Sequence, residues 1–161
     1  GIRVPMIVKW PEKFADSDRV VEEPVISTDF YPSLLEMAGL PMDYGQALDG
    51  VSFVPALNGD SFDRGPIFWH FPQYSNHGMQ SPGGAIRLGD YKLLEYFEND
   101  TVQLFNLRED IGELNDLSRS EPNKAEELIS LLHAWREEVS AQMPPENPNY
   151  DPSQYPHSSS L

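Results

Sequence analysis

The sequence predicts an α+β chain: the last strand and helix of an α/β core, followed by a small antiparallel sheet packed on a C-terminal amphipathic helix. Three patterns along the chain predict it. An apolar run and then a helical spacing of apolar residues occupy the first 40 positions, short strand-like runs follow position 65, and a long helical stripe begins near position 120. A length of 161 residues suits one ordinary domain, or two small pieces of a larger one.

The first element is expected to be a strand and the second a helix. Residues 2–10 form an apolar, β-branched run ended by a proline, which is typical of a buried strand. Ser27 or Thr28 can cap the following helix, and Gly39 suits the left-handed residue that ends one. Two such elements cannot form a parallel sheet alone, so this stretch is predicted to end an α/β layer whose earlier strands are missing. The apolar residues of the helix share one face: Phe30, Leu34, Leu35 and Ala38.

Residues 40–65 are rich in Gly, Pro and Asp and are expected to be a connecting segment, with residues 51–57 as its apolar anchor. Beyond them the apolar period changes to that of strands, and the turn pairs Gly89-Asp90 and Asn99-Asp100 separate the runs at hairpin spacing. An antiparallel meander is therefore predicted, with strands at residues 66–71, 85–88, 91–97 and 102–107.

The most regular pattern belongs to the last helix. Ser120 is expected to cap it, and Pro122 is tolerated in its first turn because the missing N–H has no helical partner there. A spacing of three or four predicts its buried face: Ala125, Leu128, Leu132, Trp135, Val139 and Met143. The predicted organisation is residues 1–65 for the end of the core with its connecting segment, 66–143 for a C-terminal subdomain, and 144–161 for an irregular tail.

Composition and charge exclude several functions. Twenty-six acidic against 11 basic residues give a formal net charge of −15, which opposes binding to nucleic acid or to an anionic membrane surface. No apolar run approaches the length of a spanning helix, and the absence of cysteine excludes disulfides, Cys-ligated metals and cysteine nucleophiles. The serines show no nucleophile motif, and His70, His77, His133 and His157 show no metal-site spacing. No catalytic residue and no metal ligand is therefore assigned in this chain.

One stretch has the composition of a binding loop. Residues 68–78 contain four aromatic residues and two histidines, and they run from a predicted strand end into a loop of Gly, Ser and Asn. Rigid scaffolds often place binding groups in such loops. His70 and His77 are therefore candidate ligand contacts; the alternative is that the aromatic residues fill the core and the histidines bind nothing.

Several stretches occur together in an order and spacing that carry a family resemblance. They are Gly1-Ile2-Arg3-Val4-Pro5, Trp10-Pro11, Ser27-Thr28-Asp29-Phe30-Tyr31-Pro32-Ser33-Leu34-Leu35, Ala38-Gly39, Leu48-Asp49-Gly50-Val51-Ser52, Phe68-Trp69-His70-Phe71-Pro72, Ala85-Ile86-Arg87, Asp90-Tyr91-Lys92-Leu93, Leu104-Phe105-Asn106-Leu107 and Gly112-Glu113. From Gly1 to about Asp151 the chain resembles the C-terminal part of a formylglycine-dependent sulfatase of the arylsulfatase and N-acetylgalactosamine-6-sulfatase type, in the alkaline-phosphatase-like superfamily. Ile111 departs from the pattern, where such proteins usually have Pro.

The resemblance implies a parent reaction, the hydrolysis of a sulfate ester of a carbohydrate by formylglycine, with Ca²⁺ polarising the sulfate. In such sulfatases the Cys or Ser converted to formylglycine and the metal ligands precede the region that this chain resembles. The chain is therefore expected to supply scaffold and substrate-pocket loops, and to be inactive alone. His70, Tyr74 and His77 become candidate substrate contacts, because they fall where such a loop should leave the sheet.

The implied partners are the N-terminal part of the sulfatase and a sulfated carbohydrate, and the parent enzyme would be periplasmic or secreted. Because the net charge repels a sulfated polymer at long range, binding would depend on local cations. Two other functions stay open: a self-standing carbohydrate-binding or interaction module, and another phosphoesterase-like relative of the same fold. An exposed strand at residues 2–10 would also allow a homo-oligomer. The local cations considered are Arg3, Lys9, Arg64, Arg87 and Lys92.

Overall fold

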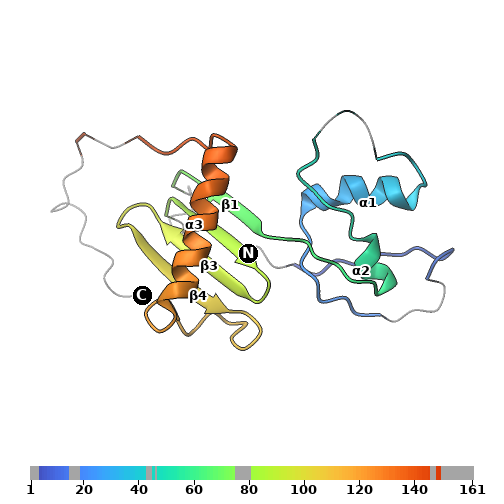
Figure 1. Cartoon of the computed structure of the whole chain (residues 1–161), viewed down its shortest axis with the longest axis horizontal. Coiled ribbons are helices and arrows are strands. Elements are labelled where there is room, and N and C mark those ends of the chain that lie inside the picture. The colour runs from blue at the N-terminus through green and yellow to red at the C-terminus, as the bar shows by residue number, and fades with distance from the viewer. Residues whose placement is uncertain are drawn as a thin grey trace. The chain divides into compact units, whose positions relative to one another are not determined.

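The computed structural model describes residues 4–14, 19–42, 45, 47–74, 81–145 and 148–149 (Figure 1). The chain forms two compact units, Gly1–Arg64 and Gly65–Leu161. The first unit holds short helices and irregular segments, and the second holds a sheet with one long helix. In the described part of the chain, no helix is both long and apolar enough to cross a membrane.

Three short helical elements make up the first unit: the 3-10 helix η1 (Ser27–Asp29), α1 (Phe30–Met37) and α2 (Val54–Asn58). α1 is the helix that the sequence predicts, and Gly39 follows it with a φ of +64°, the left-handed conformation expected there. α2 lies in the predicted apolar anchor and contributes buried side chains.

The strand predicted over residues 2–10 is wrong for residues 4–10, the part that the structure describes. These residues pair with no strand among the described residues, and Val4 and Ile7 expose 79% and 94% of their surface. A β-branched apolar run is suited to a buried strand, but a strand forms only where a neighbour exchanges backbone hydrogen bonds with it. The described residues supply no such neighbour.

The apolar face of α1 is exposed. Phe30 and Leu34 expose 42% and 61% of their surface, whereas Pro32 and Ser33 are enclosed. The spacing therefore identifies an amphipathic helix correctly, but the residues that face the interior of the first unit are on the other side. On that inner side the Ser33 hydroxyl bonds to Asp29 and Phe53, while Phe30 keeps an edge-on contact with the buried Phe53 ring.

The predicted N-terminal caps are wrong at both helices. Ser27 and Thr28 lie within η1, and α1 has no side-chain cap. At the last helix, Ser120 donates its hydroxyl to the carbonyl of Leu117 at 3.2 Å, and Glu121 occupies the capping position without a capping hydrogen bond. A residue caps a helix only from the position directly before the first turn, and the capping positions Asp29 and Glu121 lie one or two residues beyond the predicted caps.

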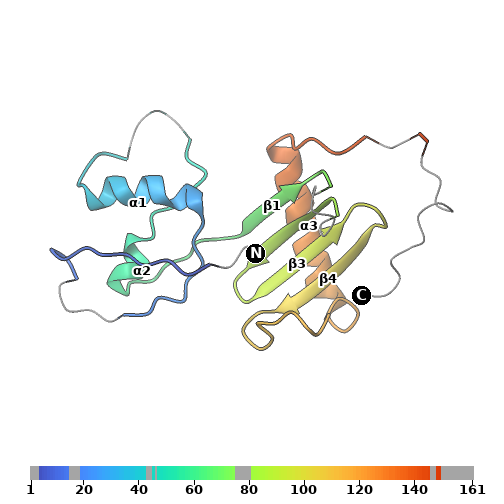
Figure 2. The same ribbon diagram turned by 180° about the vertical axis from the view of Figure 1, so that it is seen from behind.

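The second unit contains the predicted antiparallel meander, with the strand order β1-β2-β3-β4 (Figure 2). Its strands are β1 (Ile67–Phe71), β2 (Gly83–Leu88), β3 (Tyr91–Tyr96) and β4 (Thr101–Asn106). The first turn is the predicted pair Gly89-Asp90, because Leu88 lies opposite Tyr91. The second turn is longer than predicted: Tyr96 lies opposite Thr101, so it spans residues 97–100 and contains the predicted pair Asn99-Asp100.

The long helix α3 (Pro122–Glu138) lies across one face of this sheet, in front of it in Figure 1 and behind it in Figure 2. Phe68 of β1 stacks on Trp135 of α3, with ring centroids 4.8 Å apart. The helix starts at Pro122 as predicted but ends before Val139 and Met143, which are exposed. The core between sheet and helix consists of Ile86, Leu93, Leu104, Ala125, Leu128 and Leu132.

Candidate functional site

One end of the sheet carries two of the three residues that the sequence predicts as substrate contacts. β1 and β3 both end there, at Phe71 and Tyr96, so the segments that follow them leave the sheet on the same side. His70 is the last residue but one of β1, and Tyr74 follows the strand. His77 lies outside the described residues.

His70 is half-buried and is held by the segment that follows α3. Its Nε2 lies 2.9 Å from the carbonyl oxygen of Gln142. Since a carbonyl can only accept, Nε2 carries the proton of this hydrogen bond. The ring of His70 also lies against Phe97, with centroids 5.7 Å apart and planes at 45°. Its Nδ1 is buried and has no hydrogen-bond partner among the described residues.

Tyr74 joins the segment after β1 to the turn between β3 and β4. Its hydroxyl donates to Oε1 of Glu98 at 2.7 Å, while 65% of the residue's surface is exposed. The side chain therefore presents an aromatic surface to solvent from a fixed position, which is a common arrangement in ligand sites.

A row of residues crosses the sheet at this end. His70, Gly84 and Glu95 lie opposite one another on β1, β2 and β3. Arg136 of α3 reaches into the row: it forms an ion pair with Glu95, and its guanidinium lies 5.0 Å from the centre of the Phe97 ring. The side chains of Arg136 and Glu95 expose only 10% and 14% of their surface, and burial lowers the pKa of Arg136.

The sequence interpretation did not identify Glu95 or Arg136. His133, one turn before Arg136, also contacts Glu95, with 2.7 Å between Nε2 and Oε1. Two basic residues three positions apart on one helix give a weak signal for a shared acidic partner. Only the packing of α3 on the sheet brings Glu95 to them, and no local pattern encodes that packing.

A matching tyrosine lies at the opposite end of β3. The hydroxyl of Tyr91 donates to Oε2 of Glu121 at 2.9 Å, and Nζ of Lys124 lies 5.4 Å from the ring centroid. The hydrogen bond to Glu121 is the main reason that the pKa of Tyr91 is raised. Tyr74 and Tyr91 thus each bind one glutamate, at opposite ends of the sheet.

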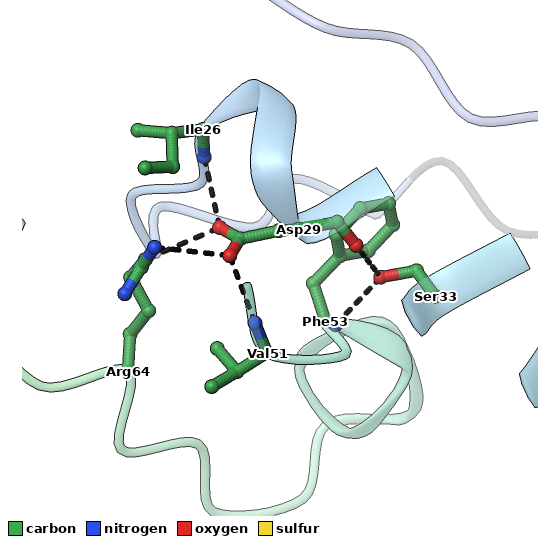
Figure 3. Close-up of polar contacts among 6 residues, drawn as sticks. All are labelled: Ile26, Asp29, Ser33, Val51, Phe53 and Arg64. Carbon is green, nitrogen blue, oxygen red and sulfur yellow. Dashed lines mark hydrogen bonds and ion pairs between the residues drawn. The ribbon is translucent and has the colours of Figure 1, made fainter. Parts of the chain in front are cut away.

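In the first unit, Asp29 is the centre of a polar network (Figure 3). Its fully buried carboxylate accepts the N–H of Ile26 at 2.9 Å and of Val51 at 3.0 Å. Arg64 donates to both oxygens, from Nε at 3.1 Å and from Nη2 at 2.9 Å. Each oxygen accepts two hydrogen bonds, so the group is fully satisfied and serves the scaffold rather than a ligand.

Ser33 and Gly50 complete this network. The Ser33 hydroxyl donates to the Asp29 carbonyl at 2.6 Å and accepts the N–H of Phe53 at 3.0 Å, which joins α1 to the segment before α2 (Figure 3). A Cβ at Gly50 would lie 2.1 Å from the carbonyl oxygen of Thr28, so only glycine allows this close approach. The stretches around Asp29 and Gly50, both part of the family resemblance, are thus in contact.

Two of the cations considered for substrate binding are already paired. Arg64 binds Asp29, and Lys92 binds Glu113 with 2.7 Å between Nζ and each carboxylate oxygen. The side chains of Arg64 and Lys92 are largely buried. Neither is therefore available to a sulfated ligand in this arrangement.

The described residues do not fit the calcium site that the family resemblance implies for the complete enzyme. Among them, no three His, Asp or Glu side chains are grouped so as to hold a metal ion. The chain also has no cysteine, and its serines lie in no nucleophile motif. What the sheet end offers is hydrogen bonding, aromatic contact and a buried ion pair, which are means of binding and positioning.

The comparisons with known proteins agree on one family. Residues 1–142 match the family model described as N-sulphoglucosamine sulphohydrolase, C-terminal. A sulfatase of Formosa agariphila is 34% identical over 149 residues, which cover 84% of this chain and 27% of that protein. Arylsulfatase K of Danio rerio is 29% identical over 135 residues, covering 81% of this chain and 25% of that protein.

Solved structures agree with the fold. The crystal structure of Ps i-CgsB in complex with k-i-k-neocarrahexaose superposes with a TM-score of 0.59 and 26% identity, covering 71% of this chain and 25% of that one. The chain thus spans about a quarter of the length of the proteins it matches. With its small antiparallel sheet, its α3 and its match over residues 1–142, the chain belongs to the sulfatase family and corresponds to the C-terminal region of such proteins.

Proposed function

We propose that this chain is the C-terminal part of a sulfatase that hydrolyses sulfate esters of carbohydrates, and that it supplies scaffold and substrate contacts to the complete enzyme. The observation that carries the proposal is the family match over residues 1–142, in a chain that spans about a quarter of its relatives. The nucleophile and the calcium that the family resemblance implies would come from the remaining part of the enzyme. The chain alone is then inactive.

The name of the matching family model and the ligand of one structural relative favour a carbohydrate substrate. The matching family model carries the name of an enzyme that acts on sulphoglucosamine, and one structural relative was solved with a neocarrahexaose. Aromatic side chains with fixed polar groups beside them suit the alternating apolar and hydroxyl surfaces of a sugar.

Within this function, His70, Tyr74 and His77 are the proposed substrate contacts. His70 and Tyr74 are supported by their common place at one end of the sheet and by the unpartnered Nδ1 of His70. The Nε2–H of His70 is committed to Gln142, so Nδ1 is the ring nitrogen that remains for a substrate group.

The partner that we propose for the first unit is the preceding α/β part of the same sulfatase. The support is the exposed apolar surface of α1 and of residues 4–10, including Ile7 and Leu34. Exposed apolar side chains that gather on one surface often mark a site that binds another protein. A second copy of the chain, paired through residues 4–10, is the alternative occupant.

The proposed contacts are tested in the complete enzyme by steady-state kinetics on a sulfated oligosaccharide. Replacing Tyr74→Phe removes one Tyr–Glu hydrogen bond at the proposed site, and Tyr91→Phe removes one at the other end of β3. We expect kcat/KM to fall about tenfold for Tyr74→Phe and for His70→Ala, and to stay within about twofold for Tyr91→Phe.

Equal kcat/KM for all four proteins would refute the assignment of these contacts. Absence of sulfate release by the unsubstituted complete protein would refute the sulfatase function itself. If the isolated chain then bound sulfated oligosaccharides, the function of a self-standing carbohydrate-binding module would replace the proposed sulfatase function.

A further inference from the structure

Arg136 occupies a space that Gly84 leaves open, at the end of the sheet that carries His70 and Tyr74. Gly84 lies between His70 and Glu95 in the row that crosses the sheet, on the side that faces α3. A Cβ at Gly84 would lie 3.1 Å from Nη2 of Arg136 and 3.3 Å from Cδ2 of Leu132. The lack of a side chain at this position therefore makes room for the guanidinium.

The side chain of Arg136 makes two contacts at the end of β3. It forms the ion pair with Glu95 on β3, and its guanidinium lies over Phe97, just beyond the end of β3. The Phe97 ring also lies against His70 on β1, at 5.7 Å between centroids. A change in the position of Arg136 therefore reaches His70 through one shared aromatic ring.

The backbone of Arg136 reaches His70 by a second path. Its carbonyl accepts the N–H of Ala141 at 2.9 Å, in the turn that ends α3, where Ser140 has a φ of +51°. The next residue, Gln142, supplies the carbonyl that holds Nε2 of His70. The turn that carries Gln142 is thus held to the end of α3 by a main-chain bond that does not depend on the side chain at position 136.

Stability alone does not account for an arginine here. The guanidinium is largely buried, and its Nε has no hydrogen-bond partner among the described residues. Buried ion pairs cost desolvation, and apolar residues of similar volume in their place are often as stable or more so. An apolar residue at position 136 would not provide the charged, planar group that contacts both Glu95 and Phe97.

We infer that Arg136 is a positioning residue for substrate binding: seated over Gly84 and paired with Glu95, it sets the orientation of His70 toward the carbohydrate. This inference rests on the proposed function. Arg136 acts through His70 and Phe97 and does not itself touch the reacting atoms. Loss of the arginine should therefore weaken binding of the saccharide and leave the chemistry of the sulfate ester unchanged.

The test uses the complete enzyme and two substrates, a sulfated oligosaccharide and 4-nitrophenyl sulfate, which carries a sulfate ester without a sugar. For Arg136→Met we expect KM for the oligosaccharide to rise about tenfold, while KM and kcat for 4-nitrophenyl sulfate stay within about twofold. The double variant Glu95→Leu/Arg136→Met should show the same rise in KM, with a Tm close to that of the unsubstituted enzyme. That result separates positioning from stability.

Leu128→Ala is the control for a general loss of stability, because Leu128 is fully buried in the core between α3 and the sheet. It should lower Tm and leave the ratio of the two KM values unchanged. The inference is overturned if Arg136→Met leaves both KM values unchanged, or raises both equally. An unsubstituted enzyme that releases no sulfate from either substrate would overturn the proposed function, and this inference with it.

Discussion

The buried carboxylate of Asp29 determines how the segments of the first unit are held together. Two backbone N–H groups and two nitrogens of Arg64 donate to it; Ile26 is three residues away in sequence, whereas Val51 and Arg64 are 22 and 35 residues away. Such a charge is tolerated in a dry environment only because every lone pair has a donor. Loss of this carboxylate would therefore remove the hydrogen-bond acceptor of a buried arginine and of two backbone amides at the same time.

Replacing Asp29→Asn in the complete protein tests this role. The amide cannot neutralise Arg64, and the loss of one partner of a buried ion pair costs about 3–5 kcal/mol. We expect hydrogen exchange at the Val51 amide, which donates to Asp29, to become markedly faster. Asp49→Asn, at an exposed position of the same unit, should leave that exchange rate unchanged. Equal rates in the two variants would contradict the account.

At the scale of elements, the second unit is stabilised by the contact of α3 with one face of the meander. Leu128 is fully buried in that contact, whereas Leu131, three residues later in the same helix, exposes 38% of its surface. Leu128→Ala should lower the free energy of unfolding of the second unit by about 2–5 kcal/mol, and Leu131→Ala by less than about 1 kcal/mol. Urea unfolding of the chain measures both. A similar loss for both variants would show that α3 does not pack as described.

The elements of the second unit could be predicted from sequence because their partners lie within the chain. The turn pair Gly89-Asp90 and the stripe through Leu128 each encode one local geometry, and the sheet and helix bury one another's apolar residues. Residues 4–10 carry an equally clear strand pattern, but no described segment pairs with them. A local pattern states what a segment can form, and the neighbouring backbone decides whether it does.

The candidate site was predictable only in part, for a related reason. His70 and Tyr74 stand out because aromatic residues and histidines are concentrated where a strand gives way to a loop. Arg136, Gly84 and Glu95 come from three elements and meet only through sheet register and helix packing. No spacing in the sequence marks such a contact, so it needs the structure.

For the whole molecule, the uneven distribution of exposed apolar residues matters most. In the first unit the apolar face of α1 and residues 4–10 are open to water, while the second unit encloses its own core. A domain that cannot bury its apolar face against itself requires another surface to do so. Together with the length of the relatives, this supports a chain that functions as one part of a longer protein.

The variant Leu34→Glu tests that dependence, since it places a charge on the exposed apolar face of α1. In the complete protein we expect a clear fall in folded yield and in Tm, because the charge would be buried against the preceding part of the enzyme. Leu114→Glu, at an 84% exposed position of the second unit, should have little effect. If Leu34→Glu changed only the oligomeric state of the chain, a second copy would be the occupant of that face.

The central claim is that this chain serves a sulfatase without carrying its nucleophile or metal ligands. The most direct measurement is sulfate release from a sulfated oligosaccharide, made in parallel on the complete protein and on the 161-residue chain alone. We predict release by the complete protein and none by the chain. Release by the chain alone at a comparable rate, or no release by the complete protein, would contradict this account.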